Sequence, residues 1–210
     1  TPNTSSAASD VYKRQGLFMT DPVLNELGAE TVYWKTGHSY MKRHTVETGA
    51  MAGFEKSGHF FFNAPIGRGY DDGLVTAITV CEMLEQNPGK SMADLNDSLP
   101  QSWGSPTMSP YCADTEKYEV VDRAIAHFQK CADDGKKVAR QSIRDLVTVN
   151  GIRITVEDGT WGLVRASSNK PGLVVVVESP VSEDRMRDMF AEIDNLLSSW
   201  SEVGEYDQKL

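Results

Sequence analysis

The sequence predicts an α/β unit followed by an α+β unit, in which a small antiparallel sheet is covered by helices. Residues 31–34 and 40–47 read as a strand and a helix joined by a short polar loop. Residues 101–110 contain Gly, Ser and several Pro-adjacent turns without any apolar period, so they form the best linker in the chain. Residues 161–166 and 173–178 then read as two strands joined by a tight loop, which is typical of an antiparallel pair.

The remaining elements of the first unit follow from apolar spacing. Residues 16–27 suit a short helix that Gly28 would end. Residues 52–62 carry three consecutive phenylalanines and read as one or two strands crossing at a glycine. A helix over 74–86 has apolar residues spaced by four and three, and a second short helix is expected over 92–99.

The second unit adds two helices and a strand to its antiparallel pair. One apolar stripe predicts a helix over 118–128, and the β-branched run at 151–156 predicts a strand. In the final helix, 186–200, apolar residues recur at intervals of four, three, four and three. Ser182 stands where it can cap that helix, so the sheet should be covered by the helix that follows it.

Composition and charge narrow the function classes. The chain has 210 residues, 40% of them hydrophobic and 24% charged, which is typical of a soluble globular protein of one or two domains. A formal net charge of −9 argues against general binding of nucleic acid, because that affinity comes from clustered Lys and Arg. No apolar run reaches the roughly 18–20 residues needed to span a bilayer, so we expect no membrane insertion.

The cysteines and the first residues bear on location and boundaries. Cys81, Cys112 and Cys131 are widely spaced and contain no CxxC pair, so neither disulfides nor a zinc site is indicated and a cytoplasmic location fits. Residues 1–15 are rich in small polar side chains, and most of them resemble a translated adapter sequence. We therefore expect 1–15 to be a non-native or disordered leader.

A first candidate binding loop occupies positions 55–59, with the sequence Glu-Lys-Ser-Gly-His. Glu55 can accept bonds from vicinal hydroxyls, Ser57 can donate or accept, and His59 can exchange a proton near neutral pH. Such a loop suits sugar hydroxyls. Composition alone favours a solvated turn by about two to one.

A second candidate loop runs from Arg165 to Pro171, between two predicted strands. It offers a guanidinium, the hydroxyls of Ser167 and Ser168, the amide of Asn169 and successive backbone N–H groups. This inventory suits a phosphate dianion. Taken alone, this loop is more often an ordinary polar hairpin loop.

A third candidate is the loop at 35–39, which follows a strand and precedes a helix, a position where loops commonly face a ligand. His38 would be its reactive member. A lone loop histidine is more often structural or solvated, and His44 and His127 are expected to be ordinary surface or interface residues.

Taken in order, the motifs at 34–39, 55–59, 71–73 and 162–167 resemble those of the α-D-phosphohexomutases, the family of phosphomannomutases and phosphoglucomutases. The resemblance runs from about residue 16 to about residue 200. It implies the last two of four domains: an incomplete α/β/α mixed-sheet domain 3 over 16–104, and a TATA-box-binding-protein-like domain 4 over 105–210. It also implies an exposed sheet edge in domain 3, because the opening strand would precede Gly16.

The resemblance also implies roles for the candidate residues. Glu55, Ser57 and His59 would hold the sugar, and His38 and His59 would lie at the reacting end as proton-handling or phosphate-contacting groups. The non-reacting phosphate would be held by four residues of the later loop, namely Arg165, Ser167, Ser168 and Asn169. The reaction would interconvert hexose 6-phosphate and hexose 1-phosphate through a 1,6-bisphosphate, which makes the enzyme an isomerase acting by intramolecular phosphoryl transfer.

Other parts of such an enzyme lie outside this sequence. It contains neither a Ser-His-Asn-Pro-like phosphoserine segment nor an Asp-x-Asp-x-Asp loop for Mg²⁺. The expected partners are therefore a glucose or mannose phosphate and the missing domains 1 and 2, and the chain is expected to be inactive alone. Phe54 stands where many family members have Gly, and the run at 168–170 also departs from the usual pattern. The second departure bears on which groups donate to the phosphate.

Two alternatives remain open at this stage. One is a mutase acting on an amino sugar, a phosphoglucosamine mutase. The other is a non-catalytic phosphosugar-binding module.

Overall fold

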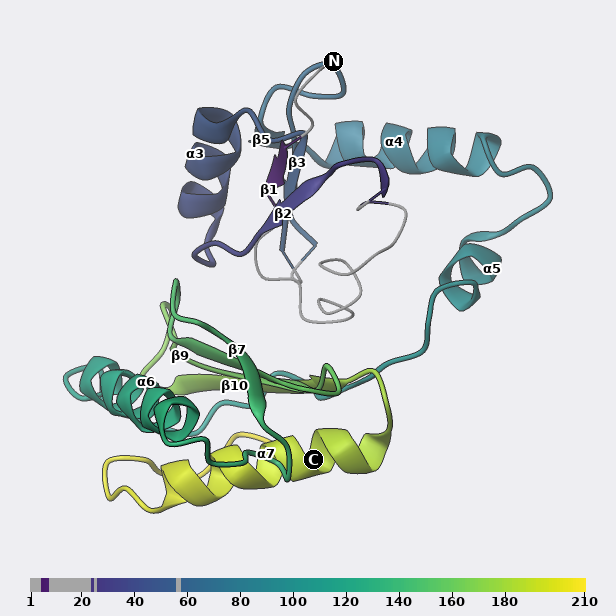
Figure 1. The fold of residues 1–210 in the computed structure, drawn as a ribbon. Helices are drawn as coiled ribbons and strands as arrows, with labels where there is room; N and C mark the ends of the chain where they lie inside the picture. Colours follow the sequence, from purple (N-terminus) through teal and green to yellow (C-terminus); the bar gives the residue numbers. More distant parts are fainter. Residues whose placement is uncertain (1–4, 8–23, 25, 56–57) are drawn as a thin grey trace. The chain divides into compact units, whose positions relative to one another are not determined.

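The computed structural model describes residues 5–7, 24, 26–55 and 58–210 and divides into two compact units (Figure 1). The first unit ends at Gln101 and the second spans Ser102–Leu210. This boundary falls at the start of the predicted linker. No helix among the described residues is both long enough and apolar enough to cross a membrane.

The described part of the first unit is a mixed α/β structure with two small sheets. Strands β1 and β2 pair in parallel, whereas β3, β4 and β5 pair antiparallel in that order. The elements are β1 (Ser5–Ala7), β2 (Glu30–Val32), α3 (His38–Thr48), β3 (Ala52–Phe54), β4 (Phe60–Phe62), β5 (Tyr70–Asp71), α4 (Gly73–Glu85) and α5 (Met92–Asp97).

The helices of this unit begin where their capping residues predict. Asp72 accepts hydrogen bonds from the backbone N–H groups of Leu74 and Val75 at 3.0 and 3.1 Å, which caps α4. Ser91 and Asp94 form a reciprocal capping box at the start of α5. The helices expected over 74–86 and 92–99 are therefore confirmed, within one or two residues at most ends.

The phenylalanine-rich segment forms a hairpin of two strands, β3 and β4, with the candidate sugar loop at its tip. Asn63 lies directly after β4. Its amide Nδ2 donates to the carbonyl oxygens of Thr45 and Ala50, both at 2.7 Å. One side chain thus fastens the end of α3 to the end of the hairpin, and this contact helps hold the loops of the unit in register.

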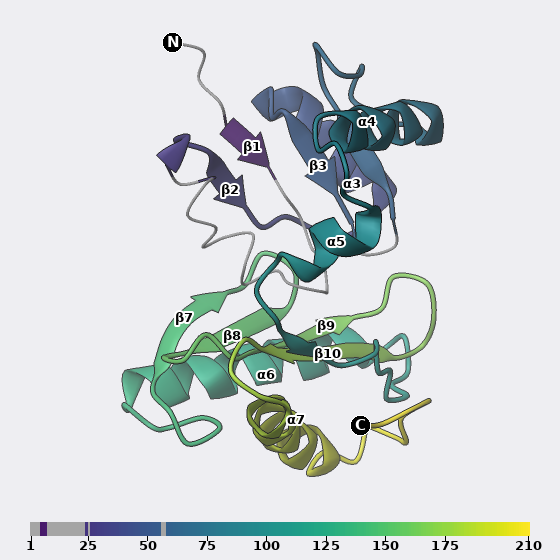
Figure 2. The ribbon, with the colours of Figure 1, turned by 90° about the vertical axis from the view of Figure 1, so that its right-hand side faces the viewer.

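The second unit is a five-stranded antiparallel sheet in the order β6-β10-β9-β8-β7, with α6 and α7 packed on one face (Figure 2). The predicted fold class is confirmed. The elements are β6 (Trp103–Gly104), α6 (Lys117–Asp133), β7 (Ile143–Val147), β8 (Ile152–Val156), β9 (Trp161–Ala166), β10 (Leu173–Ser179) and α7 (Glu183–Ser198).

The core of the second unit follows from the period of two along its strands. Alternate residues of β8 and β10 point to the helix-covered face and are fully buried. Phe128 from α6 and Ile193 from α7 pack against them. The strand residues concerned are Ile152, Ile154, Val156, Leu173, Val175 and Val177.

Two strands of the second unit were not predicted. β6 lies inside the predicted linker and pairs with the end of β10, where the N–H of Ser105 donates to the carbonyl oxygen of Val177 at 2.9 Å. β7 is an edge strand with a register shift between Ile143 and Asp145. Such an irregular, charge-bearing edge has no clear apolar alternation, so its pairing with β8 is what reveals it.

Some expectations fall on residues outside the description. The helix expected over 16–27 lies largely there. Of the leader expected over 1–15, the structure describes only Ser5–Ala7, which pair as β1 with β2. The leader stays a prediction.

A partly buried ion-pair network links α7 to a turn of the second unit. The guanidinium of Arg185 donates from Nε to Asp158 Oδ2 at 2.7 Å and from Nη1 to Asp188 Oδ2 at 3.0 Å. The same Nη1 donates to the carbonyl oxygen of Ala139 at 2.6 Å. Burial alone would raise the pKa of Asp158, but hydrogen bonds from Arg185 and Thr160 outweigh it, so that pKa lies below its ordinary value.

Asp158→Asn should therefore lower the free energy of unfolding at pH 7 by about 2 kcal/mol. Because the folded pKa is depressed, this stabilisation is present above the unfolded pKa of about 3.9 and is lost as pH falls through the folded pKa. Urea unfolding at pH 7 and below pH 4 measures the difference, which should shrink in acid. The exposed Asp184→Asn is the control, and an equal gap at both pH values would contradict the assignment.

Candidate functional site

The loop at 55–59 is a tight connection between β3 and β4. The N–H of Glu55 donates to the carbonyl oxygen of His59, and the N–H of Gly58 donates back to Glu55 O, both at 2.9 Å. Gly58 has φ of 91°, a conformation that glycine adopts without strain. Ser57, a predicted sugar ligand, lies outside the described residues.

Glu55 joins two of the candidate loops. Its side chain is buried in spite of its charge, with 7% of the residue exposed, and Oε1 accepts a hydrogen bond from Gly37 N at 2.9 Å. Gly37 is the residue from which α3 begins, so the carboxylate lies at the positive end of that helix. This contact places the sugar loop beside the loop that carries His38.

His38 and His59 meet around the carboxylate of Asp71. His59 Nδ1 lies 2.6 Å from Asp71 Oδ2, and His38 Nε2 lies 3.9 Å from the same oxygen. The two imidazole rings are 6.0 Å apart between centroids and nearly perpendicular. Asp71 is held in turn by the N–H of Phe60, which donates to Oδ1 at 3.2 Å.

The sheet explains this convergence. Asp71 is in β5, which pairs with β4 so that Asp71 stands opposite Phe61. His59 immediately precedes β4, and His38 is the first residue of α3. The ring of His38 contacts the ring of Phe61 edge-on, with 5.2 Å between their centroids. Three short segments therefore bring two imidazoles and a carboxylate to one place.

The hydrogen bond assigns a tautomer to His59. A carboxylate can only accept, so Nδ1 of His59 carries the proton, and in the neutral ring Nε2 is left as an acceptor. The His59 side chain is 44% exposed and that of His38 51%, so both can reach a ligand. The arrangement is able to bind a hydroxyl or phosphate oxygen and to move a proton at Nε2.

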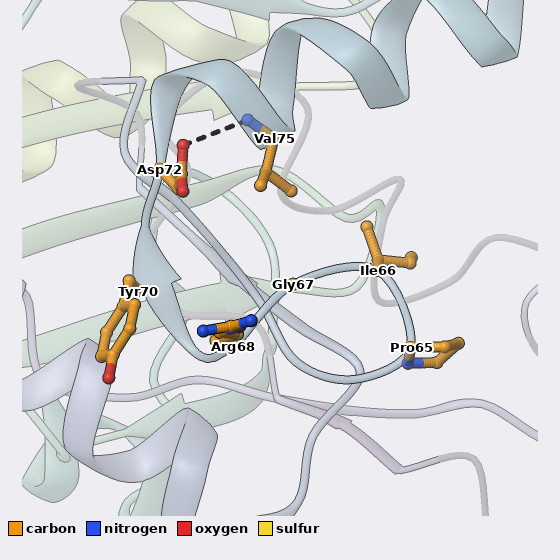
Figure 3. A pocket seen from close by; sticks show the side chains of 7 residues that line it. All are labelled: Pro65, Ile66, Gly67, Arg68, Tyr70, Asp72 and Val75. Atoms are coloured by element: carbon orange, nitrogen blue, oxygen red, sulfur yellow. Dashed lines mark hydrogen bonds between the residues drawn. The ribbon is translucent and has the colours of Figure 1, made fainter.

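A cavity of about 210 Å³ lies between the 65–68 loop and the start of α4 (Figure 3). It is lined by none of the predicted site residues. Asp72, on its wall, uses Oδ1 to cap α4, as the dashed line to Val75 shows. The lining residues are Pro65, Ile66, Gly67, Arg68, Tyr70, Asp72 and Val75.

In the second unit the candidate phosphate loop connects β9 to β10. The hydroxyl of Ser167 accepts hydrogen bonds from the N–H groups of Asn169 and Lys170, both at 3.3 Å. The N–H of Ser167 donates to Gly172 O at 3.0 Å and closes the base of the loop. Ser168 and Asn169 contact each other at 3.3 Å, so the predicted residues form one compact turn.

Arg165 stands at the end of β9, where its Nη1 donates to the carbonyl oxygen of Ala166 at 3.1 Å. On the other side of the turn, Lys170 forms an ion pair with Asp207 at 3.0 Å. Asp207 also accepts from the N–H of Ser109 at 2.7 Å, which ties the C-terminal segment to the loop. The turn therefore carries a cationic side chain at each end.

Two residues near these loops had no predicted role. Asp71 belongs to one of the sequence motifs, but nothing in its local sequence indicates that it contacts His59, 12 positions before it, and His38, 33 positions before it. Lys117 contacts Ser167, 50 positions away. An ordinary polar residue at a strand end or a helix start gives no sequence signal for such contacts.

Comparison with known families agrees with this architecture. The model for the phosphoglucomutase/phosphomannomutase α/β/α domain III matches residues 4–103, and the model for the C-terminal domain of the same enzymes matches residues 114–196. The chain belongs to the phosphoglucomutase/phosphomannomutase family. Both matches follow the order of the two compact units, so the family resemblance seen in the motifs is confirmed.

Individual relatives of the family cover most of this chain. A phosphomannomutase/phosphoglucomutase of Pseudomonas syringae is 32% identical over 166 residues, which is 79% of this chain and 33% of the relative. A phosphoglucomutase of Neisseria meningitidis is 28% identical over 91% of this chain and 39% of its own length. The chain thus spans between a third and two fifths of the length of these relatives.

Solved structures of the family show the same fold. A Burkholderia thailandensis phosphoglucomutase/phosphomannomutase family protein matches 94% of this chain and 38% of its own, with a TM-score of 0.73 and 27% identity. An Aspergillus fumigatus N-acetylphosphoglucosamine mutase, solved with GlcNAc-6P and magnesium, matches 92% of this chain and 41% of its own, with a TM-score of 0.55 and 12% identity. At 12% identity the second likeness concerns the fold alone.

The residues that the structure describes contain no group of three or more His, Cys, Asp or Glu side chains that could hold a metal ion. Magnesium prefers carboxylate and phosphate oxygens in octahedral geometry. The described residues do not fit such a site, and we assign them no step that passes through the metal.

Proposed function

We propose that the chain is the sugar- and phosphate-recognition part of a phosphomannomutase/phosphoglucomutase that interconverts hexose 6-phosphate and hexose 1-phosphate through a 1,6-bisphosphate. The observation that carries this proposal is the convergence of Glu55, His38 and His59 in the first unit. In the family this chain belongs to, such a group accompanies a phosphate loop like that of the second unit. The cytoplasm is the proposed location.

Each group has a role in the proposed reaction. Glu55 and His59 bind the sugar, with Ser57 assigned from the sequence, and His38 and His59 lie at the reacting end. Arg165 and the 167–169 turn hold the phosphate that does not react. This grip has to accept either phosphate of the sugar, because the bisphosphate turns over between the two transfer steps. In this proposal the chain is part of a longer mutase, the parent enzyme, and residues of its other domains move the phosphoryl group. Phosphoryl transfer depends mainly on positioning and electrostatics, and the loops of this chain supply the positioning.

The proposal is tested in the parent enzyme and in the chain. The enzyme should interconvert glucose and mannose 6-phosphates with their 1-phosphates faster than it acts on glucosamine phosphates. In the chain, titration with glucose 6-phosphate should shift the amide resonances of 167–169. No activity on either hexose phosphate would overturn the proposal, and a preference for glucosamine phosphate would favour the amino-sugar alternative.

Arg165→Ala in the parent enzyme should weaken phosphate binding by about 2 kcal/mol, roughly 30-fold, because a charged hydrogen bond to the phosphate is lost. The measurement is KM and kcat/KM for both hexose 6-phosphates. Arg144→Ala removes an exposed arginine from a strand of the same unit and is the matched control. If both variants have the same kinetics as the unchanged enzyme, Arg165 is not a phosphate ligand.

A further inference from the structure

The amine of Lys117 lies beneath the candidate phosphate loop. Lys117 is the first residue of α6 and is 5% exposed. Its Nζ lies 2.6 Å from Ser167 O, 3.4 Å from Lys170 O and 2.6 Å from Asp114 Oδ1. An ammonium group has three donors, and three acceptors surround this one.

The carbonyl partners are the informative ones. Ser167 and Lys170 are the first and last residues of the turn in which backbone N–H groups donate to the Ser167 hydroxyl. By accepting from one ammonium group, their carbonyl oxygens fix the distance between the two ends of the turn. Both carbonyl oxygens also point at a cation, and its positive charge offsets the repulsion between these oxygens and an incoming phosphate dianion.

The burial of this amine calls for a specific reason. Removing an ammonium group from water is unfavourable unless it is paired and hydrogen-bonded. The side chain of Asp114 is 67% exposed, so this carboxylate remains largely in water while the amine is buried. A simple surface ion pair would leave both groups exposed. The geometry instead directs the lysine inward, to the loop.

We propose that Lys117 is a positioning residue that sets the shape of the 167–170 turn for phosphate binding. It acts through the backbone of the turn and not by contact with the ligand. The inference deepens the proposed function and rests on it for the identity of the ligand. The effect on the shape of the turn is measurable without any ligand.

The test uses the whole chain and two kinds of NMR measurement. In Lys117→Met, hydrogen exchange at the amides of Asn169 and Lys170 should accelerate at least tenfold, while exchange in β8 stays unchanged. Lys117→Arg keeps a charged donor and should restore most of the protection. Lys130→Met breaks an exposed ion pair on the same helix and should change neither the exchange at the turn nor the exchange in β8.

The second measurement is titration with inorganic phosphate and with glucose 6-phosphate, followed at the same amides. Lys117→Met should bind either probe at least tenfold more weakly than the unchanged chain. Unchanged exchange and unchanged binding in a folded Lys117→Met chain would overturn the inference.

Two further outcomes separate this inference from the proposed function. If the unchanged chain binds neither probe at the turn while Lys117→Met still accelerates exchange there, the proposed function fails and the positioning of the turn by Lys117 is supported. If Lys117→Met does not fold, Asp114→Asn keeps the amine and removes only its counter-charge. Exchange at the turn should then accelerate about threefold, and no acceleration would overturn the inference.

Discussion

Replacing Gly151 with alanine is expected to destabilise the second unit by about 3 kcal/mol. Gly151 has φ of 82°, and the left-handed conformation costs an L-residue roughly 1–2 kcal/mol. A Cβ added there would lie 2.2 Å from the carbonyl oxygen of Val164 and 2.8 Å from the Cα of Arg165. Those contacts are with backbone, so a strand has to move, which adds about 1–3 kcal/mol.

The consequence should extend to the candidate phosphate loop. Gly151 precedes β8, whose Ile152 pairs with Val164 on β9. β9 ends with Arg165 and Ala166, immediately before the turn. A displacement of β9 at this point therefore moves the strand that positions Arg165, and phosphate binding should weaken together with stability.

The chain offers a matched control for this substitution. Gly135 also has positive φ, 65°, but a Cβ added there would meet no atom within 4 Å. Gly135→Ala should lower the free energy of unfolding by only about 1 kcal/mol, because alanine is strained at positive φ but meets no neighbouring atom there. Urea unfolding followed through the amide signals of β8 and β9 compares the two. Equal losses in both variants would show that crowding against β9 contributes nothing.

Asp71→Asn in the parent enzyme is expected to reduce mutase activity on the order of 100-fold, roughly 2.7 kcal/mol of barrier. The asparagine keeps the shape of Asp71 but offers an amide that can donate, so it no longer requires the proton of His59 at Nδ1. The ring loses its fixed tautomer and orientation, and Nε2 is no longer reliably the acceptor. The loss should appear mainly in kcat, because a reacting group is mispositioned.

The neighbouring residue provides the control for this prediction. Asp72→Asn retains a good N-cap for α4 and contacts neither histidine, so it should leave activity within a few-fold of normal. The tautomer can be read in the chain itself from long-range ¹⁵N–¹H correlations of His59, which should show protonated Nδ1 before the substitution and a mixture after it. An unchanged tautomer in Asp71→Asn, with full activity, would remove Asp71 from the mechanism.

Much of the fold could be predicted because its signals are local. The caps at Asp72 and Ser182 and the apolar stripes of α4, α6 and α7 each depend on residues within one helix. β8 and β10 could be recognised because they are dense in β-branched residues, and β9 because it pairs across a tight loop with β10. By contrast, β6 and β7 have no such pattern, since each is an edge strand that pairs on one side only.

The candidate loops could likewise be found from sequence, because each gathers its polar groups within five to seven consecutive positions. Their roles nevertheless stay proposals. How Glu55 reaches the start of α3 follows only from the pairing of β3 with β4 and the packing of α3 beside them. No local pattern predicts that contact.

The sequence by itself determined the family, the two-unit organisation and the order of the candidate motifs, because these depend on residue types along the chain. Only the tertiary structure decided which side chains support them. Asp71 reaches His59 through a strand pairing, and Lys117 reaches Ser167 through the packing of a helix end against a loop. Such contacts depend on strand register and on buried charge finding its partners, and both are settled only when the whole unit has folded.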